Sequence, residues 1–108
     1  VTLEDGKNYG LGEKRFALHV IDGEGNEIAV TVSTDQETVG AALEEWNIVA
    51  GEDGDYGLYI ETVNNITADF NTDGSYWVFY IDGEYAMTGV DSTEINEDSV
   101  YTLQVTKG

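Results

Sequence analysis

Residues 14–32 read KRFALHVIDGEGNEIAVTV, and this stretch decides the fold because its apolar residues recur at every second position. Such alternation is typical of β-strands with one buried face. Between the two alternating runs, residues 22–26 supply Asp, Gly and Asn, which tolerate the positive φ angles of tight turns. The stretch therefore predicts an N-terminal β-hairpin. Its expected buried face comprises Phe16, Leu18, Val20, Ile28, Val30 and Val32.

A single short helix is predicted after the hairpin, because the apolar period changes beyond Asp35. The apolar residues are then spaced by three and four positions, which places them on one face of a helix. Thr38 is a residue type that caps helix N-termini. The helix face comprises Val39, Ala42, Leu43 and Trp46. A lone amphipathic helix needs a sheet on which to bury this face, so the pattern indicates an α+β fold.

More strands follow the helix, each bounded by Gly, Asn or Asp. They are expected at residues 58–63, 76–81 and 100–106. A short return strand over residues 85–87 is expected to pair with the strand before it across Asp82 and Gly83. Residues 51–55, with the sequence GEDGD, predict a loop by their turn chemistry.

The element order predicts a β-grasp-like mixed sheet packed against one short helix, beginning with the N-terminal β-hairpin. Residues 13–108 are expected to form one domain, because 108 residues are too few for two independent cores. Residues 1–12 carry Gly and charge without any period, and they predict a flexible N-terminal arm.

The charge balance excludes several classes of partner. There are 22 acidic residues against four basic ones, a formal net charge of −18. Nucleic acid is excluded as a partner because phosphate backbones require clustered Lys and Arg. The absence of cysteine excludes disulfides, thiol catalysis and Cys-ligated zinc. The sequence has no apolar stretch near the roughly 20 residues that a membrane-spanning helix requires, and we expect any targeting segment or anchor to lie outside these residues.

Four segments together resemble a known family. They are ETVGAAL at residues 37–43, YGLY at 56–59, YWVFYIDG at 76–83 and GVD at 89–91. In this order the segments resemble the transcobalamin C-terminal-like family of bacterial surface proteins, also called domain of unknown function 4430. The resemblance extends from Lys14 to the end of the sequence.

The resemblance implies a β-grasp fold, no catalytic activity, and export to the surface of a Gram-positive bacterium, often as a lipoprotein or cell-wall protein. In the vitamin B12 carriers the related domain caps cobalamin held against a separate helical barrel, and no such barrel is present in this sequence. Through its similarity to these carriers, the resemblance implies that the ligand is a corrinoid such as cobalamin. The matching positions lie around Tyr76, Trp77 and the hairpin that follows.

Tyr76, Trp77, Tyr85 and Met87 are the candidate ligand-binding residues, because flat ligands are held largely by stacking on large apolar side chains. Core packing is the alternative for Trp77, since it alternates with Phe79 and Ile81 on one strand face. Tyr76, Val78 and Tyr80 lie on the opposite face. If no helix covers that face, it is an apolar surface of the kind that marks interaction sites.

Asp69, Asn71 and Asp73 are the candidate metal ligands, with calcium as the expected cation. Together with Gly74 they match the first half of a calcium-binding loop, in which alternating oxygen ligands converge on the ion. The second half is missing, because Tyr80 occupies the position where a bidentate Glu is expected. A simple turn is the alternative, since Asp, Asn and Gly are common turn residues.

No catalytic constellation is evident, and we expect a protein that is not an enzyme. His19 is the single histidine, so neither a zinc cluster nor a Ser-His relay can be assembled from the sequence. Three functions stay open: a domain that binds a small molecule, a structural or adhesive module that contacts other surface proteins, and a cation-dependent module. We expect the chain to be monomeric.

Overall fold

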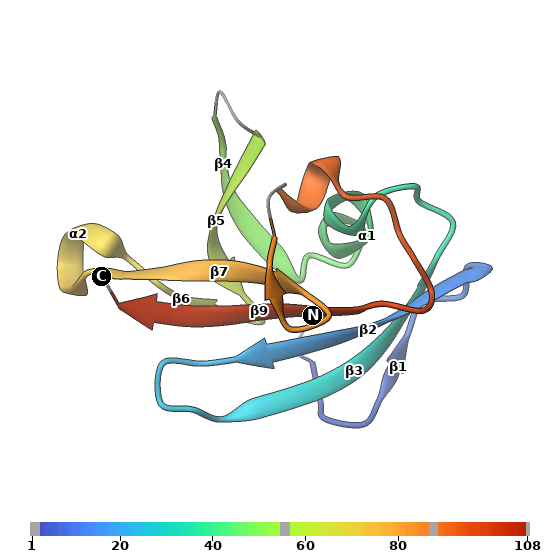
Figure 1. The fold of residues 1–108 in the computed structure, drawn as a ribbon, viewed down its shortest axis with the longest axis horizontal. Helices are drawn as coiled ribbons and strands as arrows, with labels where there is room; N and C mark the ends of the chain where they lie inside the picture. The colour runs from blue at the N-terminus through green and yellow to red at the C-terminus, as the bar shows by residue number, and fades with distance from the viewer. Residues whose placement is uncertain (1–2, 55–56, 87–88, 108) are drawn as a thin grey trace.

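The computed structural model describes residues 3–54, 57–86 and 89–107, which build two β-sheets and three short helices (Figure 1). The first half of the chain contains β1 (Asn8–Tyr9), β2 (Lys14–Ile21), β3 (Glu27–Thr34), α1 (Val39–Glu45), β4 (Val49–Gly54) and β5 (Gly57–Val63). The second half contains β6 (Ile66–Thr67), α2 (Phe70–Asp73), β7 (Ser75–Ile81), β8 (Glu84–Tyr85), the 3-10 helix η1 (Val90–Ser92) and β9 (Val100–Lys107).

The larger sheet has six strands in the order β1-β3-β2-β9-β7-β8. Strands β2 and β3 form the predicted antiparallel hairpin, with Phe16 opposite Val32 and Ile21 opposite Glu27. The C-terminal strand β9 lies parallel to β2 and antiparallel to β7, so the sheet is mixed. This arrangement confirms the predicted α+β, β-grasp-like class.

The core lies between one face of this sheet and α1. The alternating residues Phe16, Leu18 and Val20 of β2 are fully buried, as are Val39 and Leu43 of the helix. Each such side chain contributes on the order of 1.5–3 kcal/mol when removed from water. Thr38 caps α1 as predicted, because its Oγ1 accepts a 3.2 Å hydrogen bond from the Ala41 N–H.

The smaller sheet contains β4, β5 and β6, and its hairpin corrects one prediction. Residues 51–55 are predicted as a loop, but Gly51 to Gly54 belong to β4 and pair antiparallel with β5. The strand register shifts between Ala50 and Gly51, which is the signature of a β-bulge. Partner-strand hydrogen bonds therefore override the local turn preference of this Gly- and Asp-rich run.

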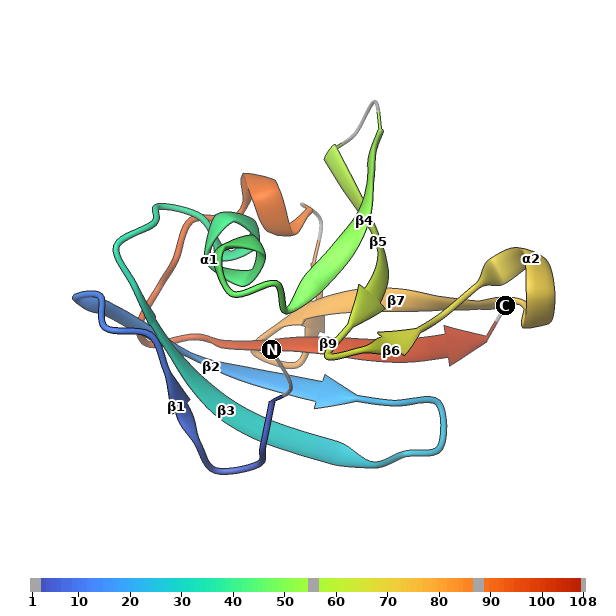
Figure 2. The ribbon, with the colours of Figure 1, turned by 180° about the vertical axis from the view of Figure 1, so that it is seen from behind.

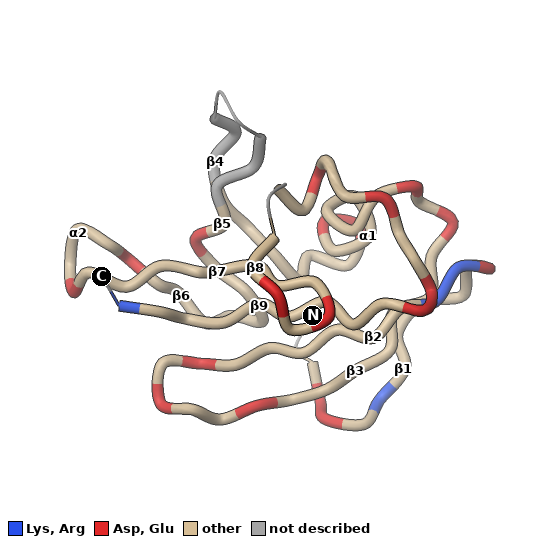
Figure 3. Tube along the Cα trace, viewed as in Figure 1, with Lys and Arg blue, Asp and Glu red and all other residues tan. Residues whose placement is uncertain are grey.

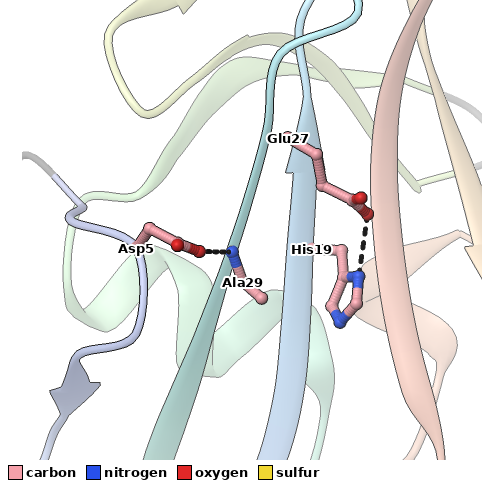
Figure 4. Close-up of polar contacts among 4 residues, drawn as sticks. All are labelled: Asp5, His19, Glu27 and Ala29. Carbon is pink, nitrogen blue, oxygen red and sulfur yellow. Dashed lines mark hydrogen bonds and ion pairs between the residues drawn. The ribbon is translucent and has the colours of Figure 1, made fainter.

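The segment before β2 packs against the domain, whereas the sequence predicts a flexible arm over residues 1–12. Leu3 is only 5% exposed and belongs to the core cluster. The Gly6 N–H donates to the Ala29 carbonyl at 2.8 Å, and the Asp5 carboxylate accepts from the Ala29 N–H at 2.7 Å (Figure 4). The segment thus occupies the outer edge of β3, and the described part of the domain extends back to Leu3.

The covering elements all lie on one side of the six-stranded sheet. Figures 1 and 2 show α1, η1 and the β4–β5 hairpin on this same side. We call the opposite side of the six-stranded sheet the outer face. Within residues 3–54, 57–86 and 89–107, α2 contacts one end of the outer face through Phe70 and Tyr76, and α1, η1 and the β4–β5 hairpin do not cover it. None of the described helices has the length and apolar character that a membrane-spanning helix needs.

Candidate ligand-binding face

The side chains of β7 divide between the two sides of the sheet. Trp77, Phe79 and Ile81 pack against the core cluster. The alternate residues Tyr76, Val78 and Tyr80 lie opposite Thr106, Gln104 and Thr102 of β9, on the outer face. The strand pattern therefore separates two of the predicted ligand-binding residues, Tyr76 and Trp77, onto opposite sides.

Trp77 connects the two sheets. Its indole Nε1–H donates a 3.1 Å hydrogen bond to the backbone carbonyl of Glu61 in β5. Its ring packs beside Phe79 against the buried cluster. Trp77 therefore packs against the core, as the alternative prediction states. It is not part of the candidate ligand-binding face.

Tyr76 lies at one end of the outer face, next to an aromatic residue that the sequence does not single out. The ring of Phe70, in α2, lies 6.2 Å from the ring of Tyr76 with the planes tilted by 57°. Phe70 is 56% exposed, which is unusual for so large an apolar side chain. In the sequence Phe70 stands among the turn-forming residues Asp69, Asn71, Asp73 and Gly74, and no local signal marks it as a partner of Tyr76.

Tyr80 and Tyr85 form a second aromatic pair at the other end of β7. Residues Asp82 and Gly83 have φ angles of 52° and 84°, the two positive values that a tight two-residue hairpin requires. The turn places Tyr85 directly opposite Tyr80, with ring centroids 6.3 Å apart and planes perpendicular. Tyr85 is 68% exposed. Met87, the remaining predicted residue of this set, lies outside the described residues.

A shallow hollow of about 310 Å³ lies on the outer face beside Tyr80. Tyr80 and Ile21 supply apolar surface to it, and Thr102 and Gln104 supply hydrogen-bonding groups. Its full lining is Ile21, Glu27, Tyr80, Gly83, Thr102 and Gln104. The Glu27 carboxylate lies 2.9 Å from Nδ1 of His19, which projects from the next strand on the same face (Figure 4).

The three predicted metal ligands are placed around α2, where the oxygens of Asp69 and Asp73 accept hydrogen bonds from nearby residues. Asp69 caps the helix, with Oδ1 accepting from the Asn71 N–H and Oδ2 accepting from the Thr72 hydroxyl. Asp73 accepts from both the hydroxyl and the N–H of Ser75. The Ser75 side chain, followed by its backbone N–H, holds the pKa of Asp73 below the ordinary value of 3.8.

A turn and a short helix account for these contacts. In the described part of the chain, no three His, Cys, Asp or Glu side chains are grouped as metal ligands. Asp73 also borders a hollow of about 370 Å³ together with Asp22 and Glu24, from the turn between β2 and β3. That hollow has acidic walls, and Lys107 lines it as well.

Comparison with known proteins places the chain among characterised folds. The family model described as domain of unknown function (DUF4430) matches residues 36–107. A crystal structure of a "putative metal binding protein" from Ruminococcus gnavus ATCC 29149 is 34% identical, with a TM-score of 0.83, and the match covers 89% of this chain and 99% of that one. No curated protein matches the sequence.

Haptocorrin in complex with Cbi is similar at the level of the fold. Its TM-score is 0.58 at 18% identity, and the match covers 88% of this chain but 26% of haptocorrin. This chain therefore corresponds in fold to about a quarter of that larger protein.

Proposed function

This chain belongs to the DUF4430 family, and we propose that it is a non-catalytic binding domain whose ligand lies on the outer face of the six-stranded sheet. The observation that carries the proposal is the pair of aromatic contacts, Phe70 with Tyr76 and Tyr80 with Tyr85, on the sheet face opposite α1, η1 and the β4–β5 hairpin. Exposed aromatic side chains gathered on one face, as Phe70 and Tyr85 are here, are typical of interaction sites.

Burial of the neighbouring outer-face residues supports the same proposal. Val78, between the two tyrosines on β7, is only 7% exposed, so the middle of this strand is already shielded from water. Thr102 and Gln104 of β9 remain partly exposed beside it and can orient a ligand by hydrogen bonds. A ligand that stacks on the rings thus finds both apolar contact and polar groups.

A corrinoid is the ligand class that we propose first. The support is the family resemblance in residues 37–43 and 76–83, together with the fold similarity to haptocorrin. A flat macrocycle suits a surface whose affinity derives from stacking and desolvation. Display outside the cell is part of this proposal, as the family resemblance implies.

Thermal unfolding in the presence of cobinamide or cobalamin tests the proposal. A ligand that binds only the native state stabilises it by about 2.7 kcal/mol at a hundredfold excess over Kd. We expect the melting temperature to rise for the wild type and to rise much less for Tyr85→Ala. Leu11→Ala is the matched control, because Leu11 is fully exposed at a different surface, beside Trp46. No rise at millimolar corrinoid would exclude this ligand class.

Cation binding is the second candidate function, favoured by the name of the Ruminococcus gnavus relative at 34% identity. Under this proposal Asp69 and Asp73 exchange their local hydrogen bonds for a calcium ion, which the side-chain oxygen of Asn71 also binds. The melting temperature would then rise with calcium, fall again with a chelator, and lose its calcium dependence in Asp73→Ala. If the melting temperature of the wild type is the same with and without calcium, cation binding is excluded.

A further inference from the structure

The hollow beside Tyr80 combines the two features that bind an organic cation. The face of a Tyr ring attracts a positive charge through its quadrupole. Glu27 adds a carboxylate to the same hollow, and Ile21 adds apolar surface for the alkyl substituents. We propose that this hollow binds a small molecule through an alkylammonium group. The inference rests on the proposed function in one respect, that the outer face is the binding face.

The distribution of charge over the molecule favours a cation at this position. The basic residues lie at the periphery: Lys14 and Arg15 at the start of β2, Lys7 before β1, and Lys107 at the end of β9 (Figure 3). None of them lines the hollow. With a net charge of −18, the surrounding field attracts cations and repels anions.

The contact between Glu27 and His19 shows that the carboxylate is already directed along the outer face. Its Oε2 lies 2.9 Å from an imidazole nitrogen (Figure 4). The strand registers place both residues on the same side of the sheet as Tyr80 and Thr102. A nitrogen-bearing group therefore already lies beside this carboxylate. An alkylammonium in the hollow would meet Glu27 on one side and the Tyr80 ring on the other.

The size of the hollow restricts the group that it admits. A volume of about 310 Å³ is at the small end of ligand pockets. Trimethylammonium and primary alkylammonium groups fit such a volume, and Thr102 and Gln104 can bind a hydroxyl carried beside the charge. Choline presents this combination and is the probe that we select.

Titration of the protein with choline, followed by amide NMR spectra, tests the inference. We expect shifts at Tyr80, Thr102 and Gln104, and a markedly weaker effect from the uncharged isostere in which carbon replaces the quaternary nitrogen. Tyr80→Leu should weaken choline binding about two- to fivefold, the size of an exposed cation–π contact, whereas Tyr80→Phe retains the ring and the binding.

Glu27→Gln should weaken choline binding about fivefold, as expected for one charge at close range in water. Glu44→Gln is the matched control, because it removes the same charge from an exposed position on α1, and it should leave binding unchanged. Equal binding of the uncharged isostere, or no shift with choline, would overturn the inference. If cobinamide then still perturbs Tyr76 and Tyr85, the binding face is upheld and only its cationic ligand is rejected.

Discussion

The indole Nε1–H of Trp77 donates a 3.1 Å hydrogen bond to the carbonyl of Glu61, and this bond ties the six-stranded sheet to the three-stranded one. Its neighbour Tyr76 points to the other side and contacts Phe70 instead. One strand therefore supplies an aromatic side chain to the core and another to the outer face.

This division predicts opposite effects for two aromatic substitutions. Trp77→Phe removes the bond to Glu61 and should lower the free energy of unfolding by about 1 kcal/mol, while ligand binding stays intact. Tyr85→Ala alters an exposed side chain and should leave stability within about 0.5 kcal/mol, while weakening binding. Urea unfolding and ligand titration of both variants check this. Loss of binding in Trp77→Phe at unchanged stability would contradict the assignment.

Gly40→Ala should destabilise the domain although alanine is the better helix former. A Cβ at Gly40 would lie 2.7 Å from the Asp91 backbone, where α1 packs on η1. Such overpacking costs about 1–3 kcal/mol, more than the roughly 1 kcal/mol that helix propensity adds. Urea unfolding measures the difference. A more stable Gly40→Ala variant would show that η1 does not pack so closely.

The turn between β2 and β3 should weaken in acid. The Asn26 side chain and then its N–H donate to Asp22 and hold the pKa of that carboxylate below 3.8. Because the folded pKa lies below the unfolded one, the stabilisation is present above pH 3.8 and is lost as the pH falls through the folded value. Asp22→Ala should thus be destabilised at neutral pH, and the difference from wild type should shrink in strong acid. A constant difference in melting temperature at all pH values would refute this role.

Removal of residues 1–9 should expose the edge of β3 and promote self-association. The segment supplies partners to the edge amides, including the Lys7 carbonyl, which accepts from the Thr31 N–H at 3.0 Å. Unpaired strand edges pair with other chains. Analytical ultracentrifugation should show concentration-dependent dimers for the truncated chain, with Asp5→Ala as a milder control. A truncated chain that stays monomeric at high concentration would contradict the expectation.

The sequence predicted those elements whose apolar period coincides with burial. The hairpin of β2 and β3 and the helix capped by Thr38 belong to this class, because their local pattern and their packing agree. Strand β4 was missed because its Gly and Asp residues favour turns, and only pairing with β5 makes them a strand. Leu3 was missed because a single buried residue has no period.

The candidate site was predictable only in part, for a related physical reason. Alternation along β7 separates Tyr76 and Tyr80 from Trp77, and this follows from the sequence. The approach of Phe70 to Tyr76 depends on the short helix α2, which has no apolar period to predict it, and the approach of Glu27 to Tyr80 depends on which strands become neighbours in the sheet. That order is set by long-range pairing between β2 and β9, which no local pattern records.

Amide NMR mapping of a cobinamide titration tests the central claim most directly, because it locates the bound ligand without assuming any residue. We predict that the perturbed amides cluster on β7, β8 and the neighbouring part of β9, around Tyr76, Tyr80 and Tyr85. If the perturbed amides are confined to α1 and its side of the sheet, and the amides of the outer-face residues do not shift, the proposed binding face is contradicted.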